Sequence, residues 1–63
     1  MTYIRFRRLW VMSYDDYQDD ERFETLDEAV EAATDWSAMV GGDIITISFI
    51  EDGKLYPHME VFA

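Results

Sequence analysis

The sequence predicts an α+β fold in which one amphipathic helix packs on an antiparallel sheet of three or four strands, in the order β(β)αββ. Three observations carry this prediction. An aromatic and β-branched segment opens the chain, a capped helical pattern occupies its middle, and two apolar segments around a turn close it. With 63 residues, the chain forms a single small domain over residues 1–63, with one core.

Residues 3–14 are rich in aromatic and β-branched side chains and predict a long first strand. Two registers remain open for it. In a regular strand, Trp10 and Met12 share one face with Arg8, whereas a bulge near Arg8 would bring Val11 to the apolar face instead. We favour the regular register, with Arg8 near the sheet edge or reaching the acidic segment that follows.

The segment after this strand predicts irregular structure. Residues 15–20 are mostly acidic and predict a loop. Residues 21–24 predict a short second strand that pairs back on the first, with Phe23 pointing inward.

A helix is predicted over residues 26–40. Thr25 and Glu28 form a capping box, in which the Thr25 hydroxyl accepts from the Glu28 amide and Glu28 reaches back to the Thr25 amide. Gly41 and Gly42 then supply the left-handed residue that ends many helices. The predicted buried stripe, at spacings of three and four residues with Trp36 beside it, consists of Leu26, Ala29, Val30, Ala33, Ser37 and Val40.

Residues 43–62 predict a hairpin that turns at Glu51-Asp52-Gly53. A two-residue turn would pair Ile47 with His58, which mixes apolar and polar side chains on one face. A three-residue turn with Gly53 as the bulge residue pairs Phe49 with Leu55 and gives a uniformly apolar face, so we expect the longer turn. Because Pro57 cannot donate to a ladder, it indicates an edge strand.

Composition excludes several function classes. The chain has no cysteine and one histidine, so disulfides, thiolate metal sites and His-rich metal sites are excluded, and we expect no metal, no cofactor and no catalytic residues. It has no apolar run long enough to span a membrane and no signal-peptide pattern. A net charge of −9 opposes direct binding to nucleic acid or anionic membrane. We expect a cytoplasmic, non-enzymatic protein.

Ten of the fourteen acidic residues fall between positions 15 and 35, where Arg22 is the single base. Like charges this close disfavour the compact state, so we consider whether the cluster has a function. Three interpretations remain open: a solvated surface, a calcium site over residues 15–21, or a protein-binding surface that imitates the DNA backbone. The candidate partner-binding acids are Asp15, Asp16, Asp19, Asp20, Glu24, Glu28, Glu31 and Asp35, with Tyr17 as an aromatic anchor.

The helix covers one face of the predicted sheet, and no segment remains to cover the other. Exposed apolar patches of this kind often mark interfaces. The predicted register places Ile44, Ile50, Tyr56, His58 and Phe62 on that uncovered face, as a homodimer or second interface. A small dimeric structural, assembly or regulatory subunit that binds through this face is therefore the alternative function.

Small size, strong acidity, one helix on an antiparallel sheet and surplus aromatic residues together resemble the small phage-encoded inhibitors of host DNA-acting enzymes. Within that group the chain is most similar to the shorter dimeric inhibitors of uracil-DNA glycosylase, and its charge resembles that of anti-restriction and anti-CRISPR DNA mimics. The likeness covers architecture and composition, without a matched motif. The resemblance implies an inhibitor in the host cytoplasm, a homodimer, that occupies the basic site of a DNA- or RNA-acting enzyme.

Overall fold

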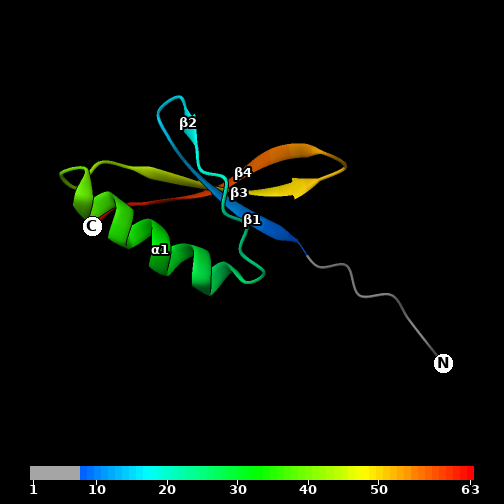
Figure 1. Cartoon of the computed structure of the whole chain (residues 1–63), viewed down its shortest axis with the longest axis horizontal. Coiled ribbons are helices and arrows are strands. Elements are labelled where there is room, and N and C mark those ends of the chain that lie inside the picture. The colour runs from blue at the N-terminus through cyan, green and yellow to red at the C-terminus, as the bar shows by residue number, and fades with distance from the viewer. Residues whose placement is uncertain (1–7) are drawn as a thin grey trace.

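A computed structural model describes residues 8–63 as one helix packed on a four-stranded antiparallel sheet (Figure 1). In chain order the elements are β1 (Leu9–Tyr14), β2 (Tyr17–Gln18), α1 (Leu26–Met39), β3 (Ile45–Glu51) and β4 (Lys54–Val61). The order across the sheet is β2-β1-β3-β4. The predicted α+β class is confirmed, with four strands. Positions 3–7 of the predicted first strand lie outside the described residues.

The register of β1 is regular over the part that the structure describes. Pairing with β3 runs without interruption from Leu9 opposite Ile50 to Ser13 opposite Thr46. Trp10 is therefore on the helix side of the sheet, in the buried cluster of the core. The Arg8 guanidinium lies over the ring of Phe49, with its central carbon 4.2 Å from the ring centroid.

The segment between β1 and the helix differs from the prediction. The second strand is β2, inside the predicted loop, because Asp15 adopts a left-handed conformation (φ 55°) that allows a two-residue turn. The predicted strand over residues 21–24 is reduced to one bridge, where Phe23 and Trp10 exchange two backbone hydrogen bonds of 2.8 and 2.9 Å. Phe23 points inward and is buried, as predicted.

Helix α1 confirms the predicted start and buried stripe and ends one residue early. The Thr25 hydroxyl accepts from the Glu28 amide at 3.2 Å and donates to the Glu28 carboxylate at 2.9 Å. At the other end, the Gly42 amide donates to the Ser37 carbonyl at 2.8 Å, and both glycines have positive φ. Of the predicted stripe, Ala29, Ala33 and Ser37 are fully buried against the sheet, and Leu26, Val30 and Val40 are half-buried at the edge of the core.

The predicted hairpin register is wrong. Asp52 and Gly53, at φ 52° and 74°, form a two-residue turn, so that Glu51 pairs with Lys54 and Phe49 with Tyr56. A register shift at His58 then restores the apolar pairing, with Ile47 opposite Met59 and Ile45 opposite Val61. The two-residue turn was rejected from sequence because, without a bulge, it would pair Ile47 with His58. A single extra residue in β4 removes this mismatch. β4 is an edge strand, as Pro57 indicated.

Candidate protein-binding surface

An aromatic contact connects the β1–β2 hairpin to the helix. The ring of Tyr17 meets that of Trp36 edge to face, with centroids 5.9 Å apart and planes at 90°. Tyr14 packs against the same indole at 6.0 Å. Tyr17 remains 58% exposed, so it is held in place by Trp36 while most of its ring faces solvent. This is the geometry of an amphipathic aromatic anchor.

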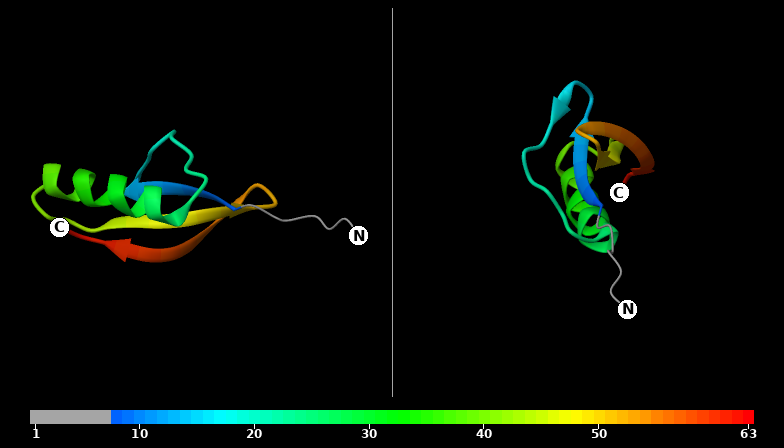
Figure 2. Two further views of the ribbon diagram at one scale, coloured as in Figure 1. Left: turned by 90° about the horizontal axis from the view of Figure 1, so that it is seen from below. Right: turned by 90° about the vertical axis from the view of Figure 1, so that its right-hand side faces the viewer.

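The acidic residues of the hairpin lie beside this contact. Asp15 and Asp16 form the turn between the two tyrosines, and both are exposed. The connection from β2 to α1 carries the acids at positions 19, 20 and 24. In that connection, the Asp19 amide donates to the carbonyl of Met12 in β1 at 3.0 Å, which fixes the start of the loop. Figure 2 shows the hairpin turn, this connection and the helix on the same side of β1, β3 and β4.

The acidic residues of the helix share its outward face. With 3.6 residues per turn, Glu28, Glu31 and Asp35 fall within an arc of about 60°, on the side opposite the buried stripe. All three are exposed. The Tyr17–Trp36 contact packs the acidic hairpin against the helix that carries these three acids. Together these residues form the acidic–aromatic surface, which consists of Asp15, Asp16, Tyr17, Asp19, Asp20, Glu24, Glu28, Glu31, Asp35 and Trp36.

Sequence reasoning missed one polar contact near this surface. The Tyr14 hydroxyl donates to the Asp43 carboxylate at 2.7 Å, across 29 residues of chain. This hydrogen bond, followed by desolvation and by the charges of Asp43 and Asp15, raises the pKa of Tyr14 above its ordinary value. The phenol is therefore neutral at ordinary pH and can hold the carboxylate. No local sequence pattern links two residues so far apart, so only the fold reveals the pair.

The predicted second interface is divided between the two faces of the sheet. Tyr56 stacks on Phe49, with centroids 5.4 Å apart, and His58 meets Trp10 edge to face at 4.9 Å. Both therefore lie on the helix side, and their predicted place on the uncovered face is wrong. The register shift at His58 is the physical reason. The other three predicted residues, Ile44, Ile50 and Phe62, alternate with core-facing neighbours and stay on the uncovered side.

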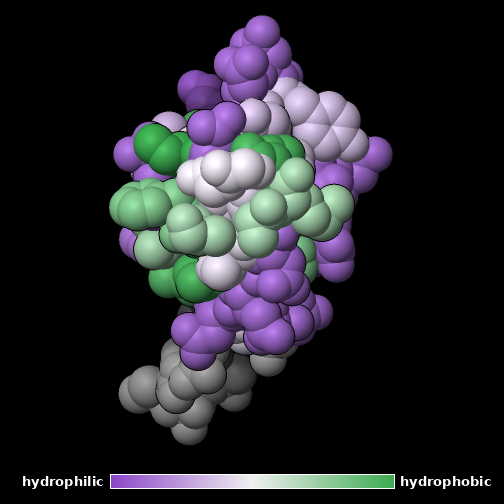
Figure 3. All heavy atoms as spheres, turned by 90° about the vertical axis from the view of Figure 1, so that its left-hand side faces the viewer, coloured by the Kyte–Doolittle hydropathy of each residue, from purple (hydrophilic) through white to green (hydrophobic). Residues whose placement is uncertain are grey.

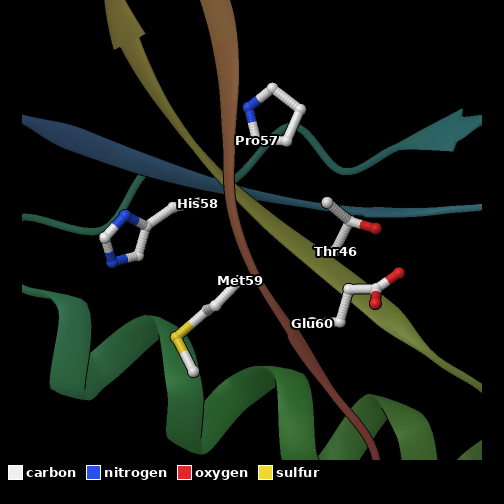
Figure 4. Close-up of a pocket in the computed structure, with 5 residues that line it drawn as sticks. All are labelled: Thr46, Pro57, His58, Met59 and Glu60. Carbon is white, nitrogen blue, oxygen red and sulfur yellow. The ribbon is translucent and has the colours of Figure 1, made fainter.

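An open depression occurs where β4 is bulged, lined by Thr46, Pro57, His58, Met59 and Glu60 (Figure 4). His58 and Met59 point to the helix side of the strand, whereas the other three side chains point to the opposite side. The depression therefore straddles one edge strand. It does not enclose a ligand between converging polar groups, which is what small-molecule sites usually do.

Within residues 8–63, no three or more His, Asp or Glu side chains are arranged to hold a metal ion. The calcium interpretation of the acidic segment thus gains no support from the described part of the chain. In that same part, no helix is both long and apolar enough to cross a membrane.

Comparison with protein families, curated proteins and solved structures gave no match for this chain. What its surfaces do therefore follows from their own geometry and charge.

Proposed function

We propose that this protein is a non-enzymatic interaction module that binds a basic protein through its acidic–aromatic surface. The partner class is a DNA- or RNA-acting enzyme of the cytoplasm, whose nucleic-acid site the surface occupies as a DNA mimic. The observation that supports the proposal most is the Tyr17–Trp36 contact at 5.9 Å, because it packs the acidic hairpin against the helix that carries Glu28, Glu31 and Asp35.

The charge density of duplex DNA determines how many of these carboxylates a DNA mimic needs. Duplex DNA carries one charge per roughly 1.7 Å of axis. Glu28, Glu31 and Asp35 spread three charges over about 10 Å of helix axis, which alone is too sparse. Only with the five carboxylates of the hairpin and its connection beside them does the density approach that of a duplex. The proposal therefore requires both segments together.

Tyr17 adds a contribution that charge alone lacks. Its ring is exposed, yet the edge-to-face contact with Trp36 limits its freedom, so little conformational entropy is lost when a partner covers it. Tyrosine is enriched among residues that dominate binding energy. We expect the carboxylates to govern the rate of association and Tyr17 to slow dissociation.

The first test is inhibition of a defined enzyme. Uracil-DNA glycosylase is the natural starting probe because of the resemblance described above, followed by a panel of nucleases and restriction enzymes, with cleavage of a labelled duplex as the readout. Inhibition should weaken at least tenfold between about 50 and 500 mM NaCl, since salt screens exposed charges. The combined variant Glu28→Gln, Glu31→Gln and Asp35→Asn should lose most of the inhibition. The Gln at position 28 retains an acceptor for the Thr25 hydroxyl.

A matched control removes three charges elsewhere. Glu51→Gln, Asp52→Asn and Glu60→Gln change the net charge equally but lie on the β3–β4 hairpin. This control should inhibit like the unaltered protein. Equal inhibition by the two triple variants would contradict the proposal. A second experiment immobilises the chain, loads a cell lysate and elutes with duplex DNA. The proposal would also be contradicted if no enzyme of the panel is inhibited and duplex DNA releases no cellular protein from the immobilised chain.

A further inference from the structure

The helix side of the β3–β4 hairpin carries an aromatic row that α1 covers only in part. Figure 1 shows the tip of this hairpin extending past the first turn of the helix. Toward the tip, cross-strand pairing aligns Trp10, Phe49 and Tyr56 in the last apolar row of that side. Trp10 is 8% exposed, whereas Tyr56, on the edge strand, is 39% exposed. The row is therefore buried at β1 and open to solvent at β4.

The neighbouring rings hold Phe49 in a fixed orientation. Tyr56 stacks on Phe49, with centroids 5.4 Å apart and planes at 20°. Trp10 meets the Phe49 ring edge to face at 5.8 Å, and His58 does so at 6.2 Å. A ring that three aromatic neighbours already restrain loses little conformational entropy when a ligand covers it. Phe49 is thus preorganised to bind a flat group.

A cation already lies on this ring. The central carbon of the Arg8 guanidinium is 4.2 Å from the centroid of Phe49. Among the residues that the structure describes, no carboxylate forms an ion pair with this guanidinium, although the chain has fourteen acidic residues. A guanidinium is planar and weakly hydrated, so it stacks well on aromatic rings. The occupant therefore indicates the ligand that the ring prefers, namely the side chain of an arginine.

Exposure of an aromatic ring does not by itself produce such a contact. Phe62, the residue before Ala63, is 68% exposed. Figure 3 shows the end of the molecule that carries the C-terminus and the last turn of the helix, where hydrophobic side chains gather. Within residues 8–63, no guanidinium lies over the ring of Phe62. Phe62 thus provides an internal reference for the contact at Phe49.

We propose that the Phe49 ring is a binding site for an arginine side chain of the basic partner, and that Arg8 occupies this site until the partner displaces it. The inference rests on the proposed function, because that function supplies a basic partner. Nucleic-acid sites use arginine to bind phosphates through two parallel hydrogen bonds. The Phe49 ring is on the helix side of the sheet, as the acidic–aromatic surface is, so one partner can reach both. Arg8 then acts as an internal competitor, and an exposed cation–π contact corresponds to a change in affinity of about two- to fivefold.

Two exposed cations provide a matched test. Arg8→Gln removes the occupant of the ring, whereas Lys54→Gln removes one positive charge from β4 and leaves Phe49 covered. The probe is N-acetyl-arginine amide, titrated into the full chain and followed by NMR of the ring protons of Phe49 and Tyr56, with Phe62 as the reference. The dissociation constant should be about two- to fivefold lower in Arg8→Gln than in Lys54→Gln. N-acetyl-lysine amide, which has the same charge but no planar group, should shift the Phe49 resonances less than half as much, as an order of magnitude.

Equal dissociation constants in the two variants would show an effect of charge alone and would overturn the proposal. Shifts at Phe49 in Arg8→Gln that do not exceed those at Phe62 would overturn it as well. Both substituted positions are exposed, so neither change disturbs the core. The probe requires no enzyme, so its result is independent of the proposed function. In the inhibition assay, Arg8→Gln should inhibit about two- to fivefold more strongly, and a panel without any inhibited enzyme would count against the proposed function alone.

Discussion

At the scale of single residues, Ser37 holds three segments of the chain together. Its hydroxyl donates to the carbonyl of Asp43 and accepts from the amide of Ala63 at 2.9 Å. Its own carbonyl receives the amide of Gly42. The side chain is fully buried. A serine in an otherwise apolar stripe is therefore a junction between the helix end, the start of β3 and the C-terminal segment.

Ser37→Ala should lower the free energy of unfolding by about 1–3 kcal/mol, because the change leaves the partly buried Asp43 carbonyl and Ala63 amide without their partner. Urea denaturation followed by tryptophan fluorescence measures this loss. Thr34→Ala is the control, since the Thr34 hydroxyl bonds only to the carbonyl of Val30 in its own helix and is exposed. Its effect should stay within about 0.5 kcal/mol. Similar losses in both variants would contradict the role given to Ser37.

At the scale of elements, the register shift in β4 explains the hairpin. Two pairs flank it, Ser48 with Pro57 and Ile47 with Met59, and His58 is left between them without a partner in the ladder. The extra residue allows a tight turn at one end of the hairpin and apolar pairing at the other. His58 turns toward Trp10 as a result.

Deletion of His58 should therefore leave the fold intact, because the two flanking pairs become neighbours in a regular ladder. Stability should fall by only about 0.5–1.5 kcal/mol, for the lost contact between the His58 and Trp10 rings. Nuclear Overhauser contacts between Phe49 and Tyr56, and between Ile45 and Val61, report the register on each side of the deletion. Loss of either contact in a folded variant would show that His58 is not the inserted residue.

Elements with strong local signals were predictable from sequence. The Thr25–Glu28 capping box and the two glycines bounded the helix to within one residue, since these interactions lie within a few positions of each other. The hairpin register was not predictable, because Leu55 and Tyr56 are both apolar and either can face the core. Part of the acidic–aromatic surface was predictable as a set of residues. Its assembly was not, since it depends on the Tyr17–Trp36 contact between distant segments.

At the scale of the whole molecule, opposite faces have opposite character. The helix side carries the acidic–aromatic surface, whereas Glu60 is the one carboxylate that the described strands place on the opposite face of the sheet. Such segregation concentrates self-repulsion on one side of a small domain, which opposes the compact state. The fold therefore depends on ionic strength more than a domain with evenly mixed charges would.

NaCl should accordingly raise the melting temperature. Between about 10 mM and 1 M NaCl we expect a rise of roughly 5 °C, which corresponds to about 1 kcal/mol for a domain of this size. Differential scanning calorimetry at constant protein concentration measures the rise. The triple variant at positions 28, 31 and 35 should show a smaller rise, because it has lost part of the repulsion. A melting temperature that salt does not change, or an equal rise in both proteins, would refute this account.

The interrupted ladder of β4 also bears on aggregation. An eight-residue edge strand could recruit strands from other chains, and fibril-forming segments are typically six or seven regular residues long. Pro57 offers no amide hydrogen, and the irregularity at His58 breaks the spacing of the groups beyond it. The free edge is thereby cut into Lys54–Tyr56 and Met59–Val61, three residues each, too short to seed a cross-β stack.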